Sequence, residues 1–239
     1  MGGIINVYLD CVSPYSQYAF LHLLRNRSVL ASHGIRIDIH PVFLGGINVG
    51  SGNKPPWTLP AKAKHGETDR RHASRYYRVP NSKPPPFFPI LSLLPQRAIT
   101  YIKHAYPPAT FEKTFDLYWK WLFDEHHDIS KPEILAELLR KTPEPGFTAQ
   151  QVDEIMAAAN DKKWKDALLA KTQEALDQGA FGAPWFYVVR TGEKGEVVEE
   201  CGFFGSDRFH YIWQFLEVPF DDIKIKPGNQ SITDAKGKL

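Results

Sequence analysis

Apolar residues recur with two different periods along the chain. Residues 4–9 form an apolar, β-branched run that predicts a strand, and residues 35–43 begin by alternating three isoleucines with polar residues, which predicts a second strand. Residues 14–31 between them repeat their apolar positions with helical spacing. The opening of the chain therefore predicts a strand, an amphipathic helix and another strand.

The middle of the chain has a different pattern. A segment rich in Gly, Asn and Pro at 45–57 predicts a loop, and the proline-rich stretch 82–89 excludes regular structure. Capping-box spacings begin at Ser130 and at Thr148, and Gly179 suits the position just after a helix. Helices are predicted over residues 67–78, 94–105, 110–125, 131–141, 149–159 and 162–178.

Strand patterns return towards the C-terminal end. Residues 185–190 and 196–204 flank a short turn and predict a β-hairpin. Residues 205–216 predict a final helix capped by Ser206 or Asp207, with irregular structure after residue 220. The predicted class is α/β, with the order βαβ, a helical insert, then ββα.

Composition and charge narrow the class of protein. The 239 residues are 43% hydrophobic and 23% charged, which is typical of a soluble globular protein with a substantial core. A net charge of +2 is too small to favour nucleic acid or an anionic membrane as a partner. We find no apolar run long enough to span a bilayer and no signal-peptide or transit-peptide pattern, so a soluble protein is expected.

The two cysteines, Cys11 and Cys201, exclude a disulfide framework and favour a reducing compartment. Each stands alone, so a buried apolar role is favoured over a redox role. The final Gly-Lys-Leu differs by one residue from the Ser-Lys-Leu peroxisomal signal, and a polar tail is the simpler interpretation. His126-His127-Asp128 lacks a spaced third ligand, so we expect no metal.

The stretch Ser13-Pro14-Tyr15-Ser16 stands where the first strand hands over to the helix. A helix N-terminus stabilises an anion, because its N–H groups are unpaired. A thiolate is common in that setting, but Ser13 could only donate a hydrogen bond to a sulfur that a ligand carries. On this stretch alone, a capping serine followed by a proline at the first helical position is the favoured interpretation.

Two further segments could contact a peptide-like ligand. Ala183-Pro184, before the third predicted strand, suggests a cis peptide that exposes the Ala183 backbone for pairing, although a trans proline that starts a strand is the alternative. Ser206 and Asp207 could hold the carboxylate and ammonium of an amino-acid head group, or could only cap a helix.

The predicted loop 45–57 and the residues just after it also offer polar and cationic groups. Asn53, Lys54 and Lys62 could contact a ligand, or could belong to a solvent-facing turn. The segment 74–89 has no pattern to which we assign a role, nor does Cys11.

Four motifs, taken in order, resemble those of kappa-class glutathione transferases, in the thioredoxin-like branch that includes DsbA and the 2-hydroxychromene-2-carboxylate isomerases. The motifs are DCVSPYS (10–16), SGNKPP with LPAK (51–56 and 59–62), GAFGAP (179–184) and FFGSDR (203–208). The resemblance implies a thioredoxin-like βαβ…ββα domain with a large all-helical domain inserted between the second and third strands. The implied boundaries are 1–57 with 179–239 for the first domain and 58–178 for the second.

The resemblance also implies a glutathione site between the two domains. Ser13 is the implied catalytic residue, with its hydroxyl hydrogen-bonded to the glutathione sulfur. Ala183 would pair the cysteinyl backbone, and Ser206 with Asp207 would hold the γ-glutamyl end. The residues implied to bind glutathione are Ser13, Pro14, Tyr15, Asn53, Lys62, Ala183, Pro184, Ser206 and Asp207.

The implied activity is conjugation of glutathione, as co-substrate, to small electrophiles, extending to peroxide reduction, without a metal. The family is dimeric, so a homodimer is expected, in the cytoplasm, a peroxisome or a mitochondrion. Two alternatives stay open at this stage. They are a glutathione-dependent isomerase of the 2-hydroxychromene-2-carboxylate type and a non-catalytic thioredoxin-like binding module.

Overall fold

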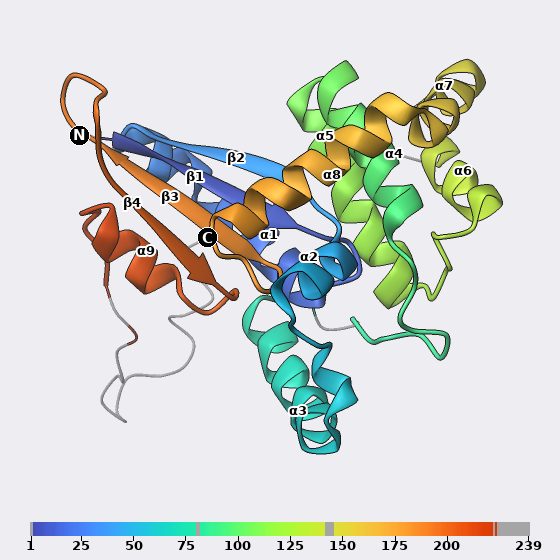
Figure 1. Ribbon diagram of the computed structural model, residues 1–239, viewed down its shortest axis with the longest axis horizontal. Helices are drawn as coiled ribbons and strands as arrows, with labels where there is room; N and C mark the ends of the chain where they lie inside the picture. Colours follow the sequence, from blue (N-terminus) through green and yellow to red (C-terminus); the bar gives the residue numbers. More distant parts are fainter. Residues whose placement is uncertain (1, 80–81, 142–145, 222, 224–239) are drawn as a thin grey trace, which may run out of the picture.

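A four-stranded mixed sheet lies at the centre of the computed structural model, which describes residues 2–79, 82–141, 146–221 and 223 (Figure 1). The strands, in their spatial order, are β2 (Ile35–Pro41), β1 (Gly2–Leu9), β3 (Trp185–Thr191) and β4 (Val197–Phe204). β1 pairs in parallel with β2 and antiparallel with β3, and β3 pairs antiparallel with β4. The two ends of the chain therefore share one sheet, as the α/β prediction requires.

Every described element between β2 and β3 is helical. The helices of the chain are α1 (Pro14–Ser32), α2 (Leu44–Ser51), α3 (Pro60–Tyr76), α4 (Leu93–Ala105), α5 (Pro108–Trp119), α6 (Pro132–Arg140), α7 (Ala149–Asn160), α8 (Lys162–Asp177) and α9 (Phe209–Phe215), with a short 3-10 turn at Pro56–Thr58 and a π-helical turn at Lys120–Asp124. One buried cluster runs from the sheet into these helices. The division into domains at residues 58 and 178 stays a prediction.

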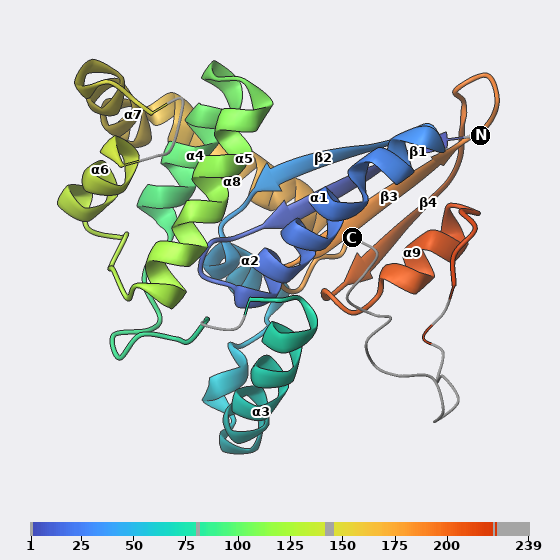
Figure 2. The same cartoon turned by 180° about the vertical axis from the view of Figure 1, so that it is seen from behind.

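The sheet is covered on both faces (Figures 1 and 2). Ile5, Val7 and Leu9 are fully buried in the cluster that includes α1 and α9, whereas Tyr8 between them packs with Ala175 of α8. Successive side chains of a strand point to opposite faces, which produces this division. The alternation predicted for residues 35–43 is confirmed in β2.

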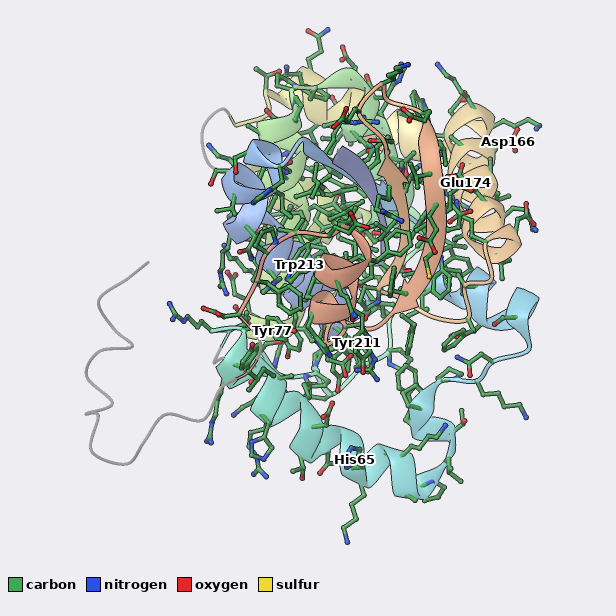
Figure 3. All side chains as sticks on the ribbon, turned by 90° about the vertical axis from the view of Figure 1, so that its left-hand side faces the viewer. His65, Tyr77, Asp166, Glu174, Tyr211 and Trp213 are labelled. Atoms are coloured by element: carbon green, nitrogen blue, oxygen red, sulfur yellow. The ribbon has the colours of Figure 1, made fainter. Side chains whose placement is uncertain are left out.

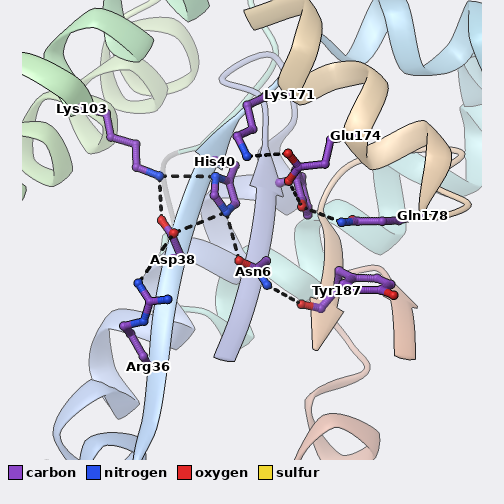
Figure 4. A network of polar contacts seen from close by, with 10 residues as sticks. Asn6, Arg36, Asp38, His40, Lys103, Lys171, Glu174, Gln178 and Tyr187 are labelled. Atoms are coloured by element: carbon purple, nitrogen blue, oxygen red, sulfur yellow. Dashed lines mark hydrogen bonds and ion pairs between the residues drawn. The ribbon is translucent and has the colours of Figure 1, made fainter. Parts of the chain in front are cut away.

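A network of polar side chains joins the α8 face of the sheet to the helices (Figure 4). Asp38 accepts a hydrogen bond from Lys103 of α4 at 2.6 Å, and the Tyr8 hydroxyl donates to Glu174 of α8 at 2.7 Å. His40 stacks on Tyr8 with ring centroids 4.9 Å apart, and burial followed by Lys103 lowers the pKa of His40 to about 4. His40 is therefore neutral at pH 7, and the network attaches α4 and α8 to the sheet.

The predicted loop 45–57 is wrong over its first half, which is α2. Glycine disfavours a helix by about 1 kcal/mol relative to alanine, and α2 contains three glycines. The missing side chains allow close packing, since an added Cβ would lie 2.5 Å from the Phe43 ring at Gly45 and 2.5 Å from Leu176 of α8 at Gly50. Tertiary packing therefore overrides the local preference.

Prolines displace two predicted helix starts. α3 begins at Pro60 rather than at residue 67, and α6 begins at Pro132, because proline suits the first helical position. Ser130 consequently does not cap α6, and its hydroxyl donates to Asp128 at 2.5 Å instead. The helix predicted over 110–125 begins at Pro108 and changes to the π-helical turn after residue 119.

The predicted helix 205–216 also starts late, at Phe209 with Arg208 at its N-cap, so neither Ser206 nor Asp207 caps it. Gly205 has a φ of +93°, which turns the chain before the helix begins. The capping box at Thr148 and the left-handed Gly179 are confirmed.

The Gly-Lys-Leu end and most of the tail after residue 220 lie outside the described residues. None of the helices that the structure describes is both long and apolar enough to cross a bilayer.

We expect Gly202→Ala to lower the free energy of unfolding by about 1–3 kcal/mol, because the new Cβ would lie 2.4 Å from the Trp185 ring at the start of β3. Gly66→Ala in α3 is the matched control. Its Cβ meets no atom within 4 Å, so we expect a gain of up to about 1 kcal/mol. Urea unfolding measures both changes, and a loss of equal size in the two variants would contradict the packing argument.

Candidate functional site

Ser13 joins the two ends of the chain through its hydroxyl. It is the N-cap of α1, with Pro14 at the first helical position, and its Oγ accepts a hydrogen bond from the Ser16 N–H at 3.2 Å. The same hydroxyl donates to the Ala183 carbonyl at 3.1 Å, across 170 residues of sequence. The Ser13 carbonyl accepts from the indole N–H of Trp119 at 3.0 Å. The predicted capping role is therefore confirmed, and the first and third motifs meet at Ser13.

The Ala183–Pro184 peptide bond is cis, as predicted. The Pro184 carbonyl accepts from the Gly205 N–H at 3.1 Å, which brings the fourth motif beside the third. The Ala183 N–H forms no hydrogen bond with any residue that the structure describes, and Ala183 is 8% exposed. One backbone donor next to the Ser13 hydroxyl is thus available to a ligand.

The fourth motif combines a buried and an exposed residue. Ser206 is 3% exposed, and its carbonyl accepts from the Tyr77 hydroxyl at the end of α3. Burial raises the pKa of Tyr77 to about 12, so the phenol is a neutral donor at pH 7. Asp207 is exposed and pairs with Arg208. Figure 3 shows Tyr77 at the end of α3 that lies near α9, with His65 farther along the helix.

The second motif reaches the third through one side-chain amide. Asn53 donates to the Phe181 carbonyl at 2.6 Å. Lys62 is connected to the group only through α3, in which Asp69 accepts from the Tyr15 hydroxyl at 2.5 Å. Lys62 and Asp69 are seven residues apart, so they lie on the same helix face, about 10 Å from each other. The structure therefore brings the implied residues to one end of the sheet, with Lys62 the most distant along α3.

Asp10 is a part of this site that the sequence analysis missed. It is fully buried, and its carboxylate accepts from the Val12 N–H at 3.0 Å, the Leu44 N–H at 2.7 Å and the Ser92 hydroxyl at 2.7 Å. Burial raises the pKa of Asp10 to about 6, against the effect of these donors, so the carboxyl is mostly ionised at pH 7. The feature of the sequence that could have revealed Asp10 is an acidic residue directly after an apolar strand.

Gln96 of α4 was also missed. Its amide donates to the Leu9 carbonyl at 2.9 Å and to the Val42 carbonyl at 2.7 Å, which closes the ends of β1 and β2. Its position on the buried side of α4, one turn from Ile99, was the signal that could have revealed it. Cys11 beside it is buried, and burial followed by Asp10 raises its thiol pKa, so it stays a neutral thiol.

The histidine pair near residue 127 has a structural environment. His127 lies 3.4 Å from Glu125 and against the Trp121 ring. Within the described ranges, no group of three or more His, Cys, Asp or Glu side chains is arranged to hold a metal ion.

Comparisons with known proteins identify the fold. The model of one family, the DSBA-like thioredoxin domain, matches residues 4–217 of the chain. Glutathione S-transferase kappa 1 of Caenorhabditis elegans is 28% identical over 90% of this chain and 91% of its own length. The human protein of that name is 26% identical over 89% of this chain and 90% of its own length.

Two solved structures share the architecture at low identity. A 2-hydroxychromene-2-carboxylate isomerase has a TM-score of 0.69 at 15% identity, covering 90% of this chain and 94% of its own. A probable DsbA oxidoreductase from Streptomyces coelicolor has a TM-score of 0.63 at 14% identity, covering 92% and 94%. These likenesses confirm the thioredoxin-like fold.

We expect Tyr77→Phe to lower the free energy of unfolding by about 1–3 kcal/mol, because it leaves the buried Ser206 carbonyl without its donor. Tyr76→Phe is the matched control, since the neighbouring Tyr76 is 68% exposed, and we expect a change within about 0.5 kcal/mol. Chemical unfolding of both variants measures the difference. Equal stabilities would show that the tyrosine hydroxyl does not hold the fourth motif.

Proposed function

Because the chain belongs to the family of DSBA-like thioredoxin domains, we propose that it is a glutathione transferase of the kappa type with Ser13 as its catalytic residue. The names of its curated relatives support this choice of activity. The observation that carries the proposal is the hydrogen bond from the Ser13 hydroxyl to the Ala183 carbonyl.

A bound peptide would take the place of the Ser13 hydroxyl as the partner of the Ala183 carbonyl. The cysteinyl backbone of glutathione would pair with the Ala183 C=O and N–H, as an added strand does. Ser13 has a single O–H, so losing the carbonyl as acceptor frees its proton for the cysteinyl sulfur. The Oγ atom itself is held by the Ser16 N–H, so only the direction of the proton needs to change.

The other implied residues would surround the same ligand. Asp207 would exchange its exposed pair with Arg208 for the γ-glutamyl ammonium, beside Ser206. Asn53 and Lys62 would add polar contacts from the second motif. Pro14, Tyr15 and Pro184 would line the cysteinyl part, where the Tyr15 N–H has no acceptor within its own helix.

The size of each effect on the thiol pKa decides whether this arrangement can activate glutathione. A free thiol with a pKa of about 8.5 is only a few per cent ionised at pH 7. One hydrogen bond to a charged group contributes about 1.5–3 kcal/mol, which lowers the pKa by roughly one to two units. The helix N-terminus adds up to about 1 kcal/mol, whereas burial beside Ser13, which is 5% exposed, acts in the opposite direction. Ser13 is thus a donor to a thiolate, neither its base nor a nucleophile.

The thiolate would attack a small electrophile, forming a carbon–sulfur bond while a leaving group departs or a proton adds to the neighbouring carbon. With a peroxide, it would attack one oxygen, so that a sulfur–oxygen bond forms, the O–O bond breaks and an alcohol or water leaves after taking up a proton. The glutathione sulfenic acid that results would react with a second glutathione thiol to give the disulfide and water. We further propose a homodimer in a reducing compartment, either the cytoplasm, a peroxisome or a mitochondrion. Glutathione serves as co-substrate and no metal takes part in these steps.

Ser13→Ala tests the role of the hydroxyl. We expect kcat to fall by about 10- to 150-fold, the equivalent of one charged hydrogen bond, with KM for glutathione within about threefold of wild type. Ultraviolet titration of the bound thiolate should give a pKa one to two units higher, because the donor is gone.

Loss of the N-cap also costs about 1 kcal/mol of stability, so folding is verified by circular dichroism at the assay temperature. Ser32→Ala is the control, since that exposed hydroxyl donates to the Val29 carbonyl of its own helix. A pH–rate profile of Ser13→Ala that overlays wild type would refute the assignment.

Substrate assays separate the proposed activity from its two alternatives. We expect glutathione-dependent turnover of a chlorodinitrobenzene-type electrophile or a hydroperoxide, because a thiolate reacts with both. Turnover of a chromene carboxylate alone would indicate the isomerase. A protein that turns over none of them and shows no thiolate band with glutathione would be a binding module.

A further inference from the structure

The buried carboxylate of Asp10 lies at the junction of three structural elements beside Ser13. On one side it accepts from the Val12 N–H, within the turn that leads into α1. On the other side it accepts from the first residue of α2, Leu44, and from Ser92, which precedes α4. These are the elements that lead to Asn53 and that contain Gln96.

The backbone of Asp10 also holds the Ser13 turn. The Asp10 carbonyl accepts from the Ser13 N–H at 3.0 Å, and the Asp10 N–H donates to the Ser16 hydroxyl at 3.4 Å. Ser16 in turn donates its backbone N–H to the Ser13 Oγ. A short chain of hydrogen bonds therefore runs from Asp10 to the hydroxyl at the centre of the site.

We propose, on the basis of the proposed function, that Asp10 is a positioning residue which aims the Ser13 hydroxyl at the glutathione sulfur. It does not touch the ligand in this role. It acts through Ser13, by fixing the turn at residues 10–13 against α2 and α4.

The surroundings of Asp10 favour a positioning role over that of an ion pair. The groups that face its carboxylate are the Ser92 hydroxyl, two backbone N–H groups and the neutral Cys11 thiol. No Lys, Arg or His among the described residues is paired with it. A buried carboxylate without a cation is costly, and it is satisfied here only by donors from the segments that it joins.

Asp10→Asn disturbs this junction with almost no change in size. An amide offers one oxygen and one N–H₂ group, and the Val12 N–H uses one carboxylate oxygen whereas the Leu44 N–H and the Ser92 hydroxyl share the other. The N–H₂ group would therefore face either the Val12 N–H or the Leu44 N–H, while the Ser92 hydroxyl can turn to accept. If the N–H₂ group faces Val12, the Ser13 turn loses its bond, and if it faces Leu44, the turn loses its anchor to α2. Ser92→Ala removes only the link to α4 and leaves both backbone donors paired.

The test is a double-mutant cycle on Ser13 and Asp10 in the full chain, with glutathione and the electrophile that wild type turns over. For Asp10→Asn we expect kcat to fall about 5- to 50-fold, KM for glutathione to stay within about threefold, and the pKa of the bound thiol to rise. For Ser92→Ala we expect a smaller fall of about two- to fivefold. Asp166→Asn, on the exposed side of α8, is the matched control and should equal wild type.

In the Ser13→Ala background, Asp10→Asn should change kcat less than twofold, because the group that it positions is absent. If the kcat losses of the two single variants multiply in the double variant, the inference is overturned and Asp10 is a purely structural residue. An unchanged pKa of the bound thiol in folded Asp10→Asn would overturn it as well. If Asp10→Asn does not fold, the same cycle with Ser92→Ala decides, and an additive result there overturns the inference. A wild-type protein without glutathione turnover would refute the proposed function itself, which is a distinguishable outcome.

Discussion

The hydrogen bond between the Ser13 hydroxyl and the Ala183 carbonyl is the contact on which the rest of the site depends. It connects the start of α1 to the turn before β3, and it places a helix N-terminus beside a backbone segment with an unused N–H. An anion-stabilising helix end and a pairing strand are separately common features. Here the helix end and the pairing segment meet at the buried Ser13 Oγ. This combination favours a ligand that is peptide-like and carries a nucleophilic atom.

The surrounding structure holds this contact from several directions. Trp119 of the helical insert fixes the Ser13 carbonyl, Gln96 closes the strand ends, and Tyr77 fixes Ser206. All three come from residues between β2 and β3, so the insert does more than cover the sheet. The site is therefore a joint product of the sheet and the helical part of the chain, which explains why no single motif identifies it.

The sequence predicts the parts of this arrangement that local chemistry determines. Strand alternation and the Ser13 cap follow from residue types and spacing, whereas the residues before β3 suggest the cis peptide at Pro184 and leave a trans peptide open. α2 could not be predicted, because its glycines are favourable only against Phe43 and α8. The caps expected at Ser130 and at Ser206 failed because a proline and a left-handed glycine set the chain direction instead.

The missing members of the site share another reason. Asp10 and Gln96 bind partners far away in sequence, and the value of a buried polar side chain depends on which donors and acceptors reach it. A single sequence gives the residue type but not those partners. The resemblance to a family supplied the expected ligand contacts, whereas the residues that support them from behind became visible only in three dimensions.

The polar network on the back of the sheet limits how the molecule can open. Lys103 in α4 and Glu174 in α8 are both bonded to strand residues, so a hinge that swings the helices away as a rigid body would break both attachments. Opening of the molecule by rotation of the helices away from the sheet is thereby disfavoured. Under the proposed function, a reactant would instead enter through local movement of the exposed segments around Asn53 and Asp207, so the lifetime of a complex would be governed by loop fluctuations rather than by interdomain motion.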